Sequence, residues 1–330
     1  MRVSIALCTS NGQTYLQEQL ESYLNQTRVP DELVVCDDVS TDETLTILRE
    51  FARLAPFPVR IYRNEKQLGY VKNFERAVGL CDGDIIFFSD QDDVWKPQKI
   101  ELMAIALEKS PSVGVIFCDA EIVNSDLQPI GRTLWEMFRF TKRLQKQIVQ
   151  GRAREVLIKM DLFWGLTIAF RSEYRDMLIP FYPGTGHDTW TAMLVAFMSD
   201  ISIVQEPLVK YRQHSDNVTG VRKRPVKAVL TTTIAKQRHN TRIKSFTNRA
   251  KPFEAMKERL LQLPNVPDLE AKVRLLDKKT AHLHSRGNMS SRRLFRVPRV
   301  LRELVTLRYH RYSRGLRDLI KDLLERDRTV

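Results

Sequence analysis

Short apolar runs alternate with amphipathic stretches over the first part of the chain. The apolar runs lie at residues 3–8, 32–36, 59–62 and 85–88. Runs of this length are typical of buried strands. Between the first two runs, apolar residues recur at helical spacing at Tyr15, Leu16, Leu20 and Leu24. The alternation predicts an α/β fold with a mostly parallel sheet and helices on both faces.

Carboxylates gather where two of these predicted strands end. Asp37 and Asp38 follow the second strand, and Asp90, Asp92 and Asp93 follow the fourth. Open α/β sheets bind ligands at the carboxyl ends of their strands, and massed carboxylates repel one another unless a hard divalent cation lies between them. An acidic loop that caps the next helix explains the second cluster equally well. Because two strands end in the same way, the clusters together favour a nucleotide site.

The cysteines and the apolar segments indicate where the protein works. Cys8, Cys36, Cys81 and Cys118 are widely spaced and form no metal-binding or redox motif, so we expect reduced core residues of a cytoplasmic protein. The apolar stretch after Arg2 is too short for a signal peptide. No segment approaches the roughly 20 apolar residues of a spanning helix. The sequence therefore predicts a soluble or peripheral protein, with the inner face of the plasma membrane as the peripheral location.

Charge is distributed unevenly along the 330 residues. Residues 1–220 carry 24 Lys and Arg against 30 Asp and Glu, whereas residues 221–330 carry 29 against 10, a net charge of +19. The change begins at Arg222-Lys223-Arg224-Pro225. We therefore expect a catalytic domain at 1–220 and a basic helical extension at 221–330. Its helices are expected around 226–230, which includes Val226, Val229 and Leu230, and at 253–263, 269–284 and 300–324.

Arginines recur at short intervals near the C-terminal end and are interleaved with apolar residues. Such a pattern predicts a surface that binds anionic lipid head groups. The alternative is a basic helical bundle packed on the catalytic domain, with solvated arginines. We favour the bundle for the extension in general and the membrane for residues 292–317. Nucleic acid is not an expected partner, because few aromatic residues are available for base stacking. The arginines concerned are Arg292, Arg293, Arg296, Arg299, Arg302, Arg308, Arg311, Arg314 and Arg317.

Six segments carry a resemblance to a known family. They are residues 3–12, 37–42, 64–73 and 89–95, the pair His187-Asp188, and residues 211–220. Each is weak alone, but six in order at plausible spacing are specific. Over residues 1–220 the chain resembles family 2 inverting glycosyltransferases with the GT-A fold. The Asp-Gln-Asp-Asp-Val-Trp wording of residues 90–95 is similar to that of bacterial rhamnosyltransferases.

The resemblance implies how the acidic residues are used. Asp92 is the expected direct ligand of Mn²⁺ or Mg²⁺. Asp90 is expected beside it, toward the ribose or a metal-bound water, and His214 as a second ligand or a donor to the diphosphate. A lone histidine in this position is equally compatible with a structural role. Asp38 is expected to accept the N3–H of a uracil or thymine base, with Asp37 as its structural partner at the strand end.

In the reaction that the resemblance implies, an acceptor hydroxyl attacks the sugar and the nucleoside diphosphate leaves. Because this hydroxyl has a very high pKa, it needs a base on the side opposite the diphosphate. Asp188 is the expected base, and simple N-capping of its helix is the alternative. Trp164 and Trp190 are expected to form the apolar walls of the pocket around Asp188, with Gly165 on the acceptor side of that pocket. The full set expected to contact the nucleotide sugar is Thr9, Asn11, Asp37, Asp38, Gly69, Asn73, Asp90, Gln91, Trp164 and Gly165.

Two residues depart from the family pattern. Ser10 lies where the family usually has Tyr, and Val39 where it usually has Gly. A β-branched residue does not easily adopt a positive φ. We therefore expect the base-binding loop to have a different shape, which leaves the nucleobase open.

The resemblance implies transfer of L-rhamnose from dTDP-rhamnose to a hydroxyl of a cell-surface polysaccharide or lipid-linked glycan, with inversion. Uridine diphosphate hexoses are alternative donors. A nucleotidyltransferase of similar architecture is a second alternative, but Thr9-Ser10-Asn11-Gly12 lacks the Gly-rich, basic phosphate loop it would need. A non-catalytic module that binds nucleotide sugars or an anionic polymer is the third.

Overall fold

The computed structural model describes residues 1–160, 162, 164–215, 217, 234–290, 292 and 294–324, with the backbone alone for 234–243. The chain divides into two compact units, Met1–Ala153 with Leu162–Val221, and Arg154–Asp161 with Arg222–Val330. Several expectations lie outside the described residues. They are the basic stretch at 222–225, the helix around 226–230, Arg293, and the motif positions 216 and 218–220.

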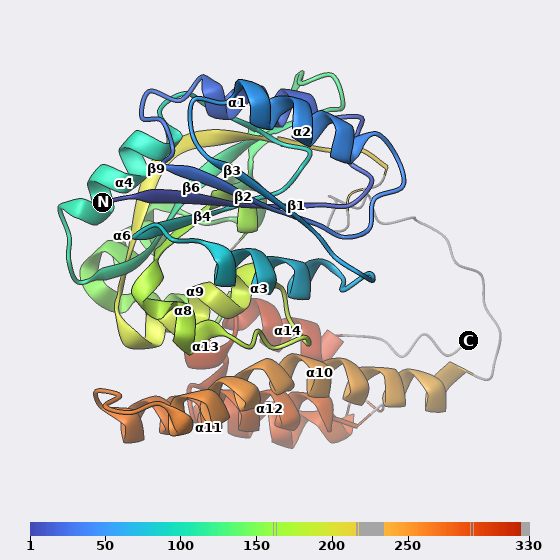
Figure 1. The fold of residues 1–330 in the computed structure, drawn as a ribbon. Helices are drawn as coiled ribbons and strands as arrows, with labels where there is room; N and C mark the ends of the chain where they lie inside the picture. The colour runs from blue at the N-terminus through green and yellow to red at the C-terminus, as the bar shows by residue number, and fades with distance from the viewer. Residues whose placement is uncertain are drawn as a thin grey trace. The chain divides into compact units, whose positions relative to one another are not determined.

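The first unit is built on one sheet with strand order β3-β2-β1-β4-β8-β6-β9-β5 (Figure 1). Strands β1 (Val3–Thr9), β2 (Glu32–Asp37), β3 (Val59–Arg63) and β4 (Ile85–Ser89) pair in parallel. Every residue of β1, β2 and β4 is buried, which explains their continuous apolar runs. All four lie where the apolar runs predict strands.

The second half of this sheet is mixed. Strand β8 (Ile168–Arg171) lies antiparallel between β4 and β6 (Val113–Val123), and β6 pairs in parallel with β9 (Asp200–Arg212). The short β5 (Val94–Trp95) and β7 (Pro129–Thr133) pair antiparallel with β9 and β6, respectively. The prediction of an α/β fold with a mostly parallel sheet is confirmed. The antiparallel strands between and beside the parallel ones are what the sequence reading missed.

Helices cover both faces of the sheet, as predicted. Figure 1 shows α1 (Leu16–Leu24) and α2 (Thr44–Leu54) on one face and α3 (Tyr70–Leu80) and α9 (His187–Met198) on the other. The other helical segments of this part are α4 (Lys99–Glu108), α5 (Leu134–Phe138), α6 (Lys142–Gln147), η1 (Ile148–Arg152), α7 (Ala153–Leu157), η2 (Gly165–Thr167), η3 (Ser172–Tyr174) and α8 (Arg175–Leu178).

The described part of the second unit is helical. Its long helices are α10 (Ile234–Gln262) and α11 (Leu269–Gly287), followed by η4 (Leu294–Arg296), α12 (Val297–Val305), α13 (Arg308–Tyr312) and α14 (Leu316–Leu324). The expectation of one helix over 300–324 is wrong. The backbone turns left-handed at Leu307 (φ 57°) and Gly315 (φ 60°), and each turn ends a helical run. Among the described residues, no helix is both long and apolar enough to cross a membrane.

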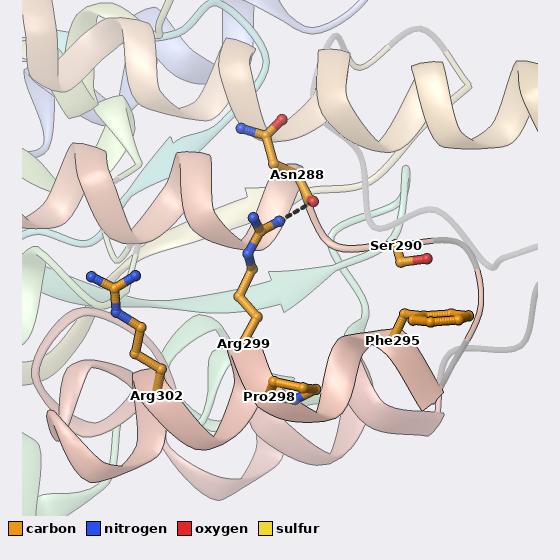
Figure 2. A pocket seen from close by; sticks show the side chains of 6 residues that line it. All are labelled: Asn288, Ser290, Phe295, Pro298, Arg299 and Arg302. Atoms are coloured by element: carbon orange, nitrogen blue, oxygen red, sulfur yellow. Dashed lines mark hydrogen bonds between the residues drawn. The ribbon is translucent and has the colours of Figure 1, made fainter.

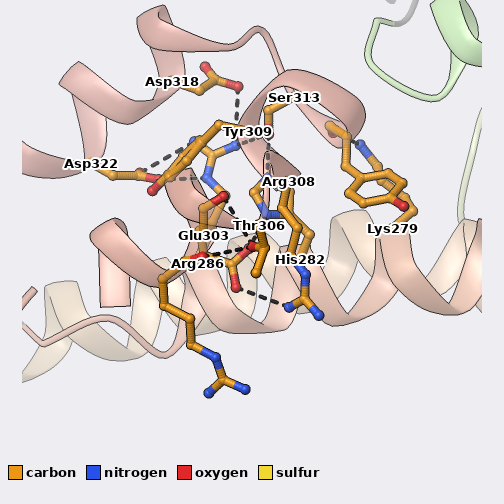
Figure 3. Close-up of polar contacts among 12 residues, drawn as sticks. Lys279, His282, Arg286, Glu303, Thr306, Arg308, Tyr309, Ser313, Asp318 and Asp322 are labelled. Atoms are coloured by element: carbon orange, nitrogen blue, oxygen red, sulfur yellow. Dashed lines mark hydrogen bonds and ion pairs between the residues drawn. The ribbon is translucent and has the colours of Figure 1, made fainter. Parts of the chain in front are cut away.

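The core of the second unit contains a network of paired charges (Figure 3). Arg286 Nε donates to Asp322 Oδ2 at 2.6 Å, and Tyr309 donates to the same oxygen at 2.9 Å. The His282 ring lies 2.6 Å from Glu303 on one side and 2.6 Å from Ser313 on the other. Burial alone would raise the pKa of Glu303, but the hydrogen bond and charge of His282 hold it below its ordinary value.

Arg296 also belongs to this interior. It is 2% exposed, and its Nη1 donates to the backbone oxygen of Asp322 at 3.1 Å. Arg308 forms an ion pair with Glu303 at 3.2 Å. The expectation that the arginines of 292–317 form one surface pattern is therefore wrong for Arg296, because its guanidinium satisfies buried carbonyl groups.

Candidate active site

The end of β2 and the loop after it form a dense hydrogen-bond network. Asp37 is buried and accepts from Thr9 Oγ1 at 3.0 Å and from the Ser40 backbone at 2.9 Å. Asp38 accepts from Asn64 Nδ2 at 2.7 Å and from the backbone of Gly69 at 2.9 Å. Asp37 thus shapes its own loop, while Asp38 joins that loop to the segment that opens α3.

Asn64 is a residue of this network to which the sequence analysis gave no role. Its Nδ2 also donates to Asn73 Oδ1 at 2.8 Å, and Asn73 in turn donates to the backbone oxygen of Cys36 at 2.8 Å. All of these side chains are buried. Asn73 therefore acts through the loop that it holds at the end of β2. The motif 64–73 contained this signal, because two asparagines in a glycine-containing loop are suited to satisfying loop backbone groups.

Val39 adopts a φ of 63°, so the expectation that it would reshape this loop by avoiding positive φ is wrong. Its neighbours hold it there. The Asn11 backbone donates to Ser40 Oγ at 2.9 Å, and the Thr41 backbone donates to Asn11 Oδ1 at 2.9 Å. A β-branched residue in this conformation costs on the order of 1–3 kcal/mol, which surrounding hydrogen bonds must offset.

Gln91 joins the acidic loop after β4 to the turn after β1. Its Oε1 accepts from the Ser10 backbone at 2.8 Å, and its Nε2 donates to the Ser10 oxygen at 3.1 Å. A Cβ on Gly12 would lie 2.4 Å from Gln91 Oε1, so only glycine leaves room for this pair of hydrogen bonds. Gln91 is thus engaged with the protein backbone and sets the distance between the two loops.

Asp92 and His214 lie together although 122 residues separate them. Asp92 Oδ2 is 2.8 Å from His214 Nε2 and accepts from Asn217 Nδ2 at 3.2 Å. Arg212, the last residue of β9, is 1% exposed and donates from Nε to the Asp92 backbone oxygen at 2.8 Å. The end of β9 therefore holds the acidic loop in place.

The neighbouring carboxylates repel one another. Burial, then the charges of Asp92 and Asp188, raise the pKa of Asp90 to about 8. Burial, then Asp92 and Asp90, also raise the pKa of Asp93, and Asp93 Oδ2 is buried without a hydrogen-bond partner among the described residues. The charge of Asp188 on α9 thus contributes to the raised pKa of a carboxyl group in the acidic loop.

Lys99 is a buried cation whose charge acts on Asp90 and Asp93. Its ammonium lies 3.3 Å from the Trp95 ring centre and donates to the Leu166 oxygen at 2.7 Å. Burial lowers the pKa of Lys99 to about 7, and Cys118, Asp93 and Asp90 oppose that shift. Lys99 therefore neutralises the acidic loop only in part.

Asp188 occupies the first turn of α9, behind Gly186 at the N-cap. Its Oδ2 accepts from the Gly165 backbone at 3.1 Å, and its Oδ1 accepts from the Thr189 backbone at 2.6 Å. A Cβ on Gly165 would lie 2.5 Å from His187 Nε2, so this approach of backbone to helix also needs glycine. Gly165, which the sequence analysis expected on the acceptor side, thus contacts the expected base through its backbone.

The tryptophans expected as walls have different surroundings. The Trp164 ring lies 4.5 Å from the Phe138 ring, and Trp164 precedes Gly165. Trp190 is 2% exposed and donates from its indole nitrogen to the Leu178 oxygen at 2.9 Å, so it is a core residue under α9. Trp164 is therefore the one whose position next to Gly165 suits a wall of the site.

The comparisons with known proteins agree with this geometry. The family model for Glycosyl transferase family 2 matches residues 4–173. The chain belongs to glycosyl transferase family 2. Membership confirms the predicted glycosyltransferase.

Two relatives of this glycosyltransferase match about two thirds of the chain, and a third matches a shorter part of it. An uncharacterized glycosyltransferase of Nostoc is 26% identical over 225 residues, 66% of this chain and 66% of the relative. The abequosyltransferase RfbV of Salmonella typhimurium is 26% identical over 232 residues, 66% of this chain and 68% of the relative. The dTDP-rhamnosyl transferase RfbG of Shigella flexneri is 39% identical over 99 residues, 29% of this chain and 34% of the relative.

Solved structures share the fold. TarS residues 1–349 of S. aureus, solved with UDP-GlcNAc, has a TM-score of 0.55 at 17% identity, covering 98% of this chain and 82% of that one. The mannosyltransferase PcManGT of Pyrobaculum calidifontis, solved with GDP-Man and Mn²⁺, has a TM-score of 0.53 at 16% identity, covering 99% and 88%. These likenesses support the GT-A fold of the glycosyltransferase.

Besides Asn64, the sequence analysis gave no role to three residues around the candidate site of the glycosyltransferase. Arg212 lies in the segment 211–220, in which the sequence analysis gave a role only to His214. Tyr70 opens α3, and its ring lies 6.2 Å from the ring of His187, the residue before Asp188. Burial, and then the charge of Asp188, raise the pKa of the Tyr70 hydroxyl. His187 stacks on Phe74 at 3.7 Å, and burial lowers its pKa to about 3, so it is neutral and packs as an aromatic residue.

Proposed function

We propose that this glycosyltransferase moves a sugar from a nucleoside diphosphate sugar to an acceptor hydroxyl by a metal-dependent, inverting displacement. One observation carries the proposal. The ring of His187, the residue before Asp188, lies 4.7 Å from the ring of Phe88, two residues before Asp90. Burial, and then the charges of Asp92 and Asp188, raise the pKa of Asp90. A diphosphate held at Asp92 and a hydroxyl held at Asp188 would therefore meet within one site, as a single displacement requires.

The acidic loop fits a divalent cation. Asp92 Oδ2 and His214 Nε2 converge at 2.8 Å. The raised pKa of Asp90 and the buried, unpartnered oxygen of Asp93 show carboxyl groups whose charged form a cation would stabilise. The described residues hold no ready-made group of three or more acidic, His or Cys ligands. Asp92, Asp90 and His214 would hold Mn²⁺ or Mg²⁺ together with oxygens of the donor. Such a metal ion acts as a Lewis acid that stabilises charge on a diphosphate.

The nucleoside end would bind between the first turn and the loop after β2. Thr9, Asn11 and Asp37 shape this loop. Asp38 presents its carboxylate next to Gly69 and to Asn64, which also donates to Asn73. Asp38 would accept the N3–H of a uracil or thymine base. Because its oxygens already accept from the 64–69 loop, the same carboxylate couples base binding to the order of that loop.

Asp188 would accept the proton of the attacking hydroxyl. The Gly165 backbone holds Oδ2 of its carboxylate, and Trp164 and Tyr70 would exclude water on the acceptor side. A positioned base contributes about 10²- to 10⁴-fold to a rate. Attack from the side opposite the diphosphate inverts the anomeric centre, so a β-linked donor gives an α-glycoside.

L-Rhamnose from dTDP-rhamnose is the favoured donor. The sequence of residues 90–95 and the 39% identity to a dTDP-rhamnosyl transferase over 99 residues support this donor. A UDP-linked hexose or N-acetyl sugar is the second candidate, since TarS of similar fold was solved with UDP-GlcNAc. The proposed acceptor is a hydroxyl of a cell-surface polysaccharide or lipid-linked glycan, reached from the cytoplasmic face of the membrane.

A thermal-shift panel of nucleotide sugars, each with and without Mn²⁺, tests this proposal. A ligand that binds the folded state raises its apparent stability by mass action. We expect the largest shift for dTDP-rhamnose with Mn²⁺, a smaller one for the donor alone, and release of the nucleoside diphosphate when acceptor is added. If none of the donors raised the melting temperature, the result would contradict the transferase function. A shift for donors without any release of diphosphate would favour a binding module.

A further inference from the structure

The second unit exposes a row of large apolar side chains. Val297, Leu301 and Val305 follow one another at four-residue spacing along α12, so they share one face, and they are 39%, 51% and 80% exposed. Leu294 and Phe295, just before α12, are 84% and 67% exposed. We call these five residues the apolar ridge. A neighbouring side of α12 is anchored, because Val300 is buried in a cluster with Met289, Tyr309 and Leu319.

A pocket of about 510 Å³ opens beside the apolar ridge (Figure 2). Arg299 and Arg302, three residues apart on α12, extend from the same side of that helix. The other lining residues are Asn288, Ser290, Phe295 and Pro298. No carboxylate is among them. The pocket thus combines cationic donors, a hydroxyl and an aromatic edge without any anion to neutralise the arginines.

The pocket is already shaped for an anion. Arg299 donates from Nη1 to the backbone oxygen of Asn288, which fixes its guanidinium at the end of α11. A guanidinium carries five N–H donors, so this one hydrogen bond leaves most of the donors of Arg299 for a ligand. Two guanidinium groups about one helical turn apart match a phosphate group, which accepts bidentate hydrogen bonds from arginine.

We propose that this pocket binds the phosphate of an anionic membrane lipid while the apolar ridge enters the lipid surface beside it. Phosphate recognition alone would leave the exposed leucines and valines unexplained, and a hydrophobic partner alone would leave the arginines unexplained. A helix with an apolar face and a rim of arginines is suited to the boundary between head groups and acyl chains. The assignment deepens the proposed action at the membrane and rests on that part of the proposed function.

Vesicle binding by the full chain tests the assignment. We expect binding to vesicles of phosphatidylcholine with phosphatidylglycerol and little binding to phosphatidylcholine alone. The double variant Arg299→Gln/Arg302→Gln should partition about thirtyfold more weakly into the anionic vesicles, given the usual contribution of an arginine near such a surface. The double variant Leu301→Ser/Val305→Ser should also lose about tenfold or more.

Two matched variants separate pocket recognition from general attraction. Arg311→Gln/Arg317→Gln removes the same charge from exposed positions of the same unit that do not line the pocket, and should lose less than about threefold. Arg299→Lys/Arg302→Lys keeps the charge but removes the bidentate guanidinium donors. It should bind the anionic vesicles severalfold more weakly than the wild type. Equal losses for the two Gln variants, or full binding by the Lys variant, would overturn the assignment to the pocket.

Further measurements separate the source of the phosphate and the proposed transfer reaction. Thermal stabilisation by millimolar inorganic phosphate, without vesicle binding, would overturn the lipid assignment in favour of a soluble phosphate. Preferential binding to single-stranded RNA over anionic vesicles would overturn it as well. Asp188→Asn should bind vesicles like the wild type, and the Arg299→Gln/Arg302→Gln variant should keep its donor-induced thermal shift. Failure of vesicle binding therefore leaves the transfer reaction to be judged by its own assays.

Discussion

The two units handle charge in opposite ways. In the first unit, Asp90, Asp92 and Asp93 lie close together with Asp188 in reach, and their mutual repulsion and burial raise the pKa values of Asp90 and Asp93. In the second unit, buried acids face buried bases, and the pKa of Glu303 falls below its ordinary value. One cluster has unbalanced charge, and the other balances its charge internally.

The difference separates a site from an architectural core. Paired charges such as Arg286 and Asp322 fix how helices meet, and each partner satisfies the other. Unbalanced carboxylates cost stability unless a ligand compensates them, so a fold that retains them points to a ligand. Strong perturbation of charged residues therefore identifies function only when the chain itself supplies no compensating partner.

The largest expected effect comes from Asp188. Asp188→Asn keeps the shape of the side chain and removes its ability to take a proton, so we expect turnover to fall about 10³-fold. Donor binding should persist, as measured by thermal shift with Mn²⁺. Loss of donor binding together with turnover would show that Asp188 shapes the donor site instead of acting as base.

The paired cluster should respond through stability. Asp322→Ala leaves Arg286 buried without its main partner, so the free energy of unfolding should fall by about 3–5 kcal/mol in a urea titration of the full chain. Asp90→Asn is the matched change in the unbalanced cluster. It relieves repulsion, so the metal-free protein should unfold at the same or a higher urea concentration. Destabilisation of similar size by both variants would remove the distinction between the clusters.

His214 should affect the metal more than the fold. His214→Ala removes one of the two converging donors, and we expect Mn²⁺ affinity to fall about 10- to 100-fold in a calorimetric titration. His284→Ala is the control, because among the described residues the His284 ring forms an exposed ion pair with Glu254 within the second unit. Unchanged affinity in the first variant would assign His214 the purely structural role of holding Asp92.

The smallest expected effect is on pH dependence and concerns Lys99. Its folded-state pKa is lowered to about 7, below the ordinary value of 10.5. Between these values the unfolded chain binds more protons, so stability rises as the pH increases from about 7 toward 10.5. Lys99→Met should flatten that rise in urea titrations at pH 7 and 9. Lys279→Met is a parallel case, since burial lowers the pKa of Lys279 to about 7 too. An unchanged slope in both variants would contradict this linkage.

The local elements were predictable from sequence, and the long-range contacts were not. Apolar period and length located β1 to β4; β1, β2 and β4 are buried throughout, and β3 is half-buried. The 122-residue separation of Asp92 and His214 has no local signature, and neither has the hydrogen-bond pair between Ser10 and Gln91. The breaks at Leu307 and Gly315 were missed because the apolar pattern continues across them.

Arg212 has a consequence for the order in which the protein is made. It follows nearly two-thirds of the sequence, yet its guanidinium contacts Glu18, the Ser125 oxygen and the Asp92 oxygen. A nascent chain that has released only β1 to β4 can pair its parallel strands but lacks the residue that fixes the acidic loop. Because contacts this distant in sequence form late, cation binding should begin only after β9 has left the ribosome.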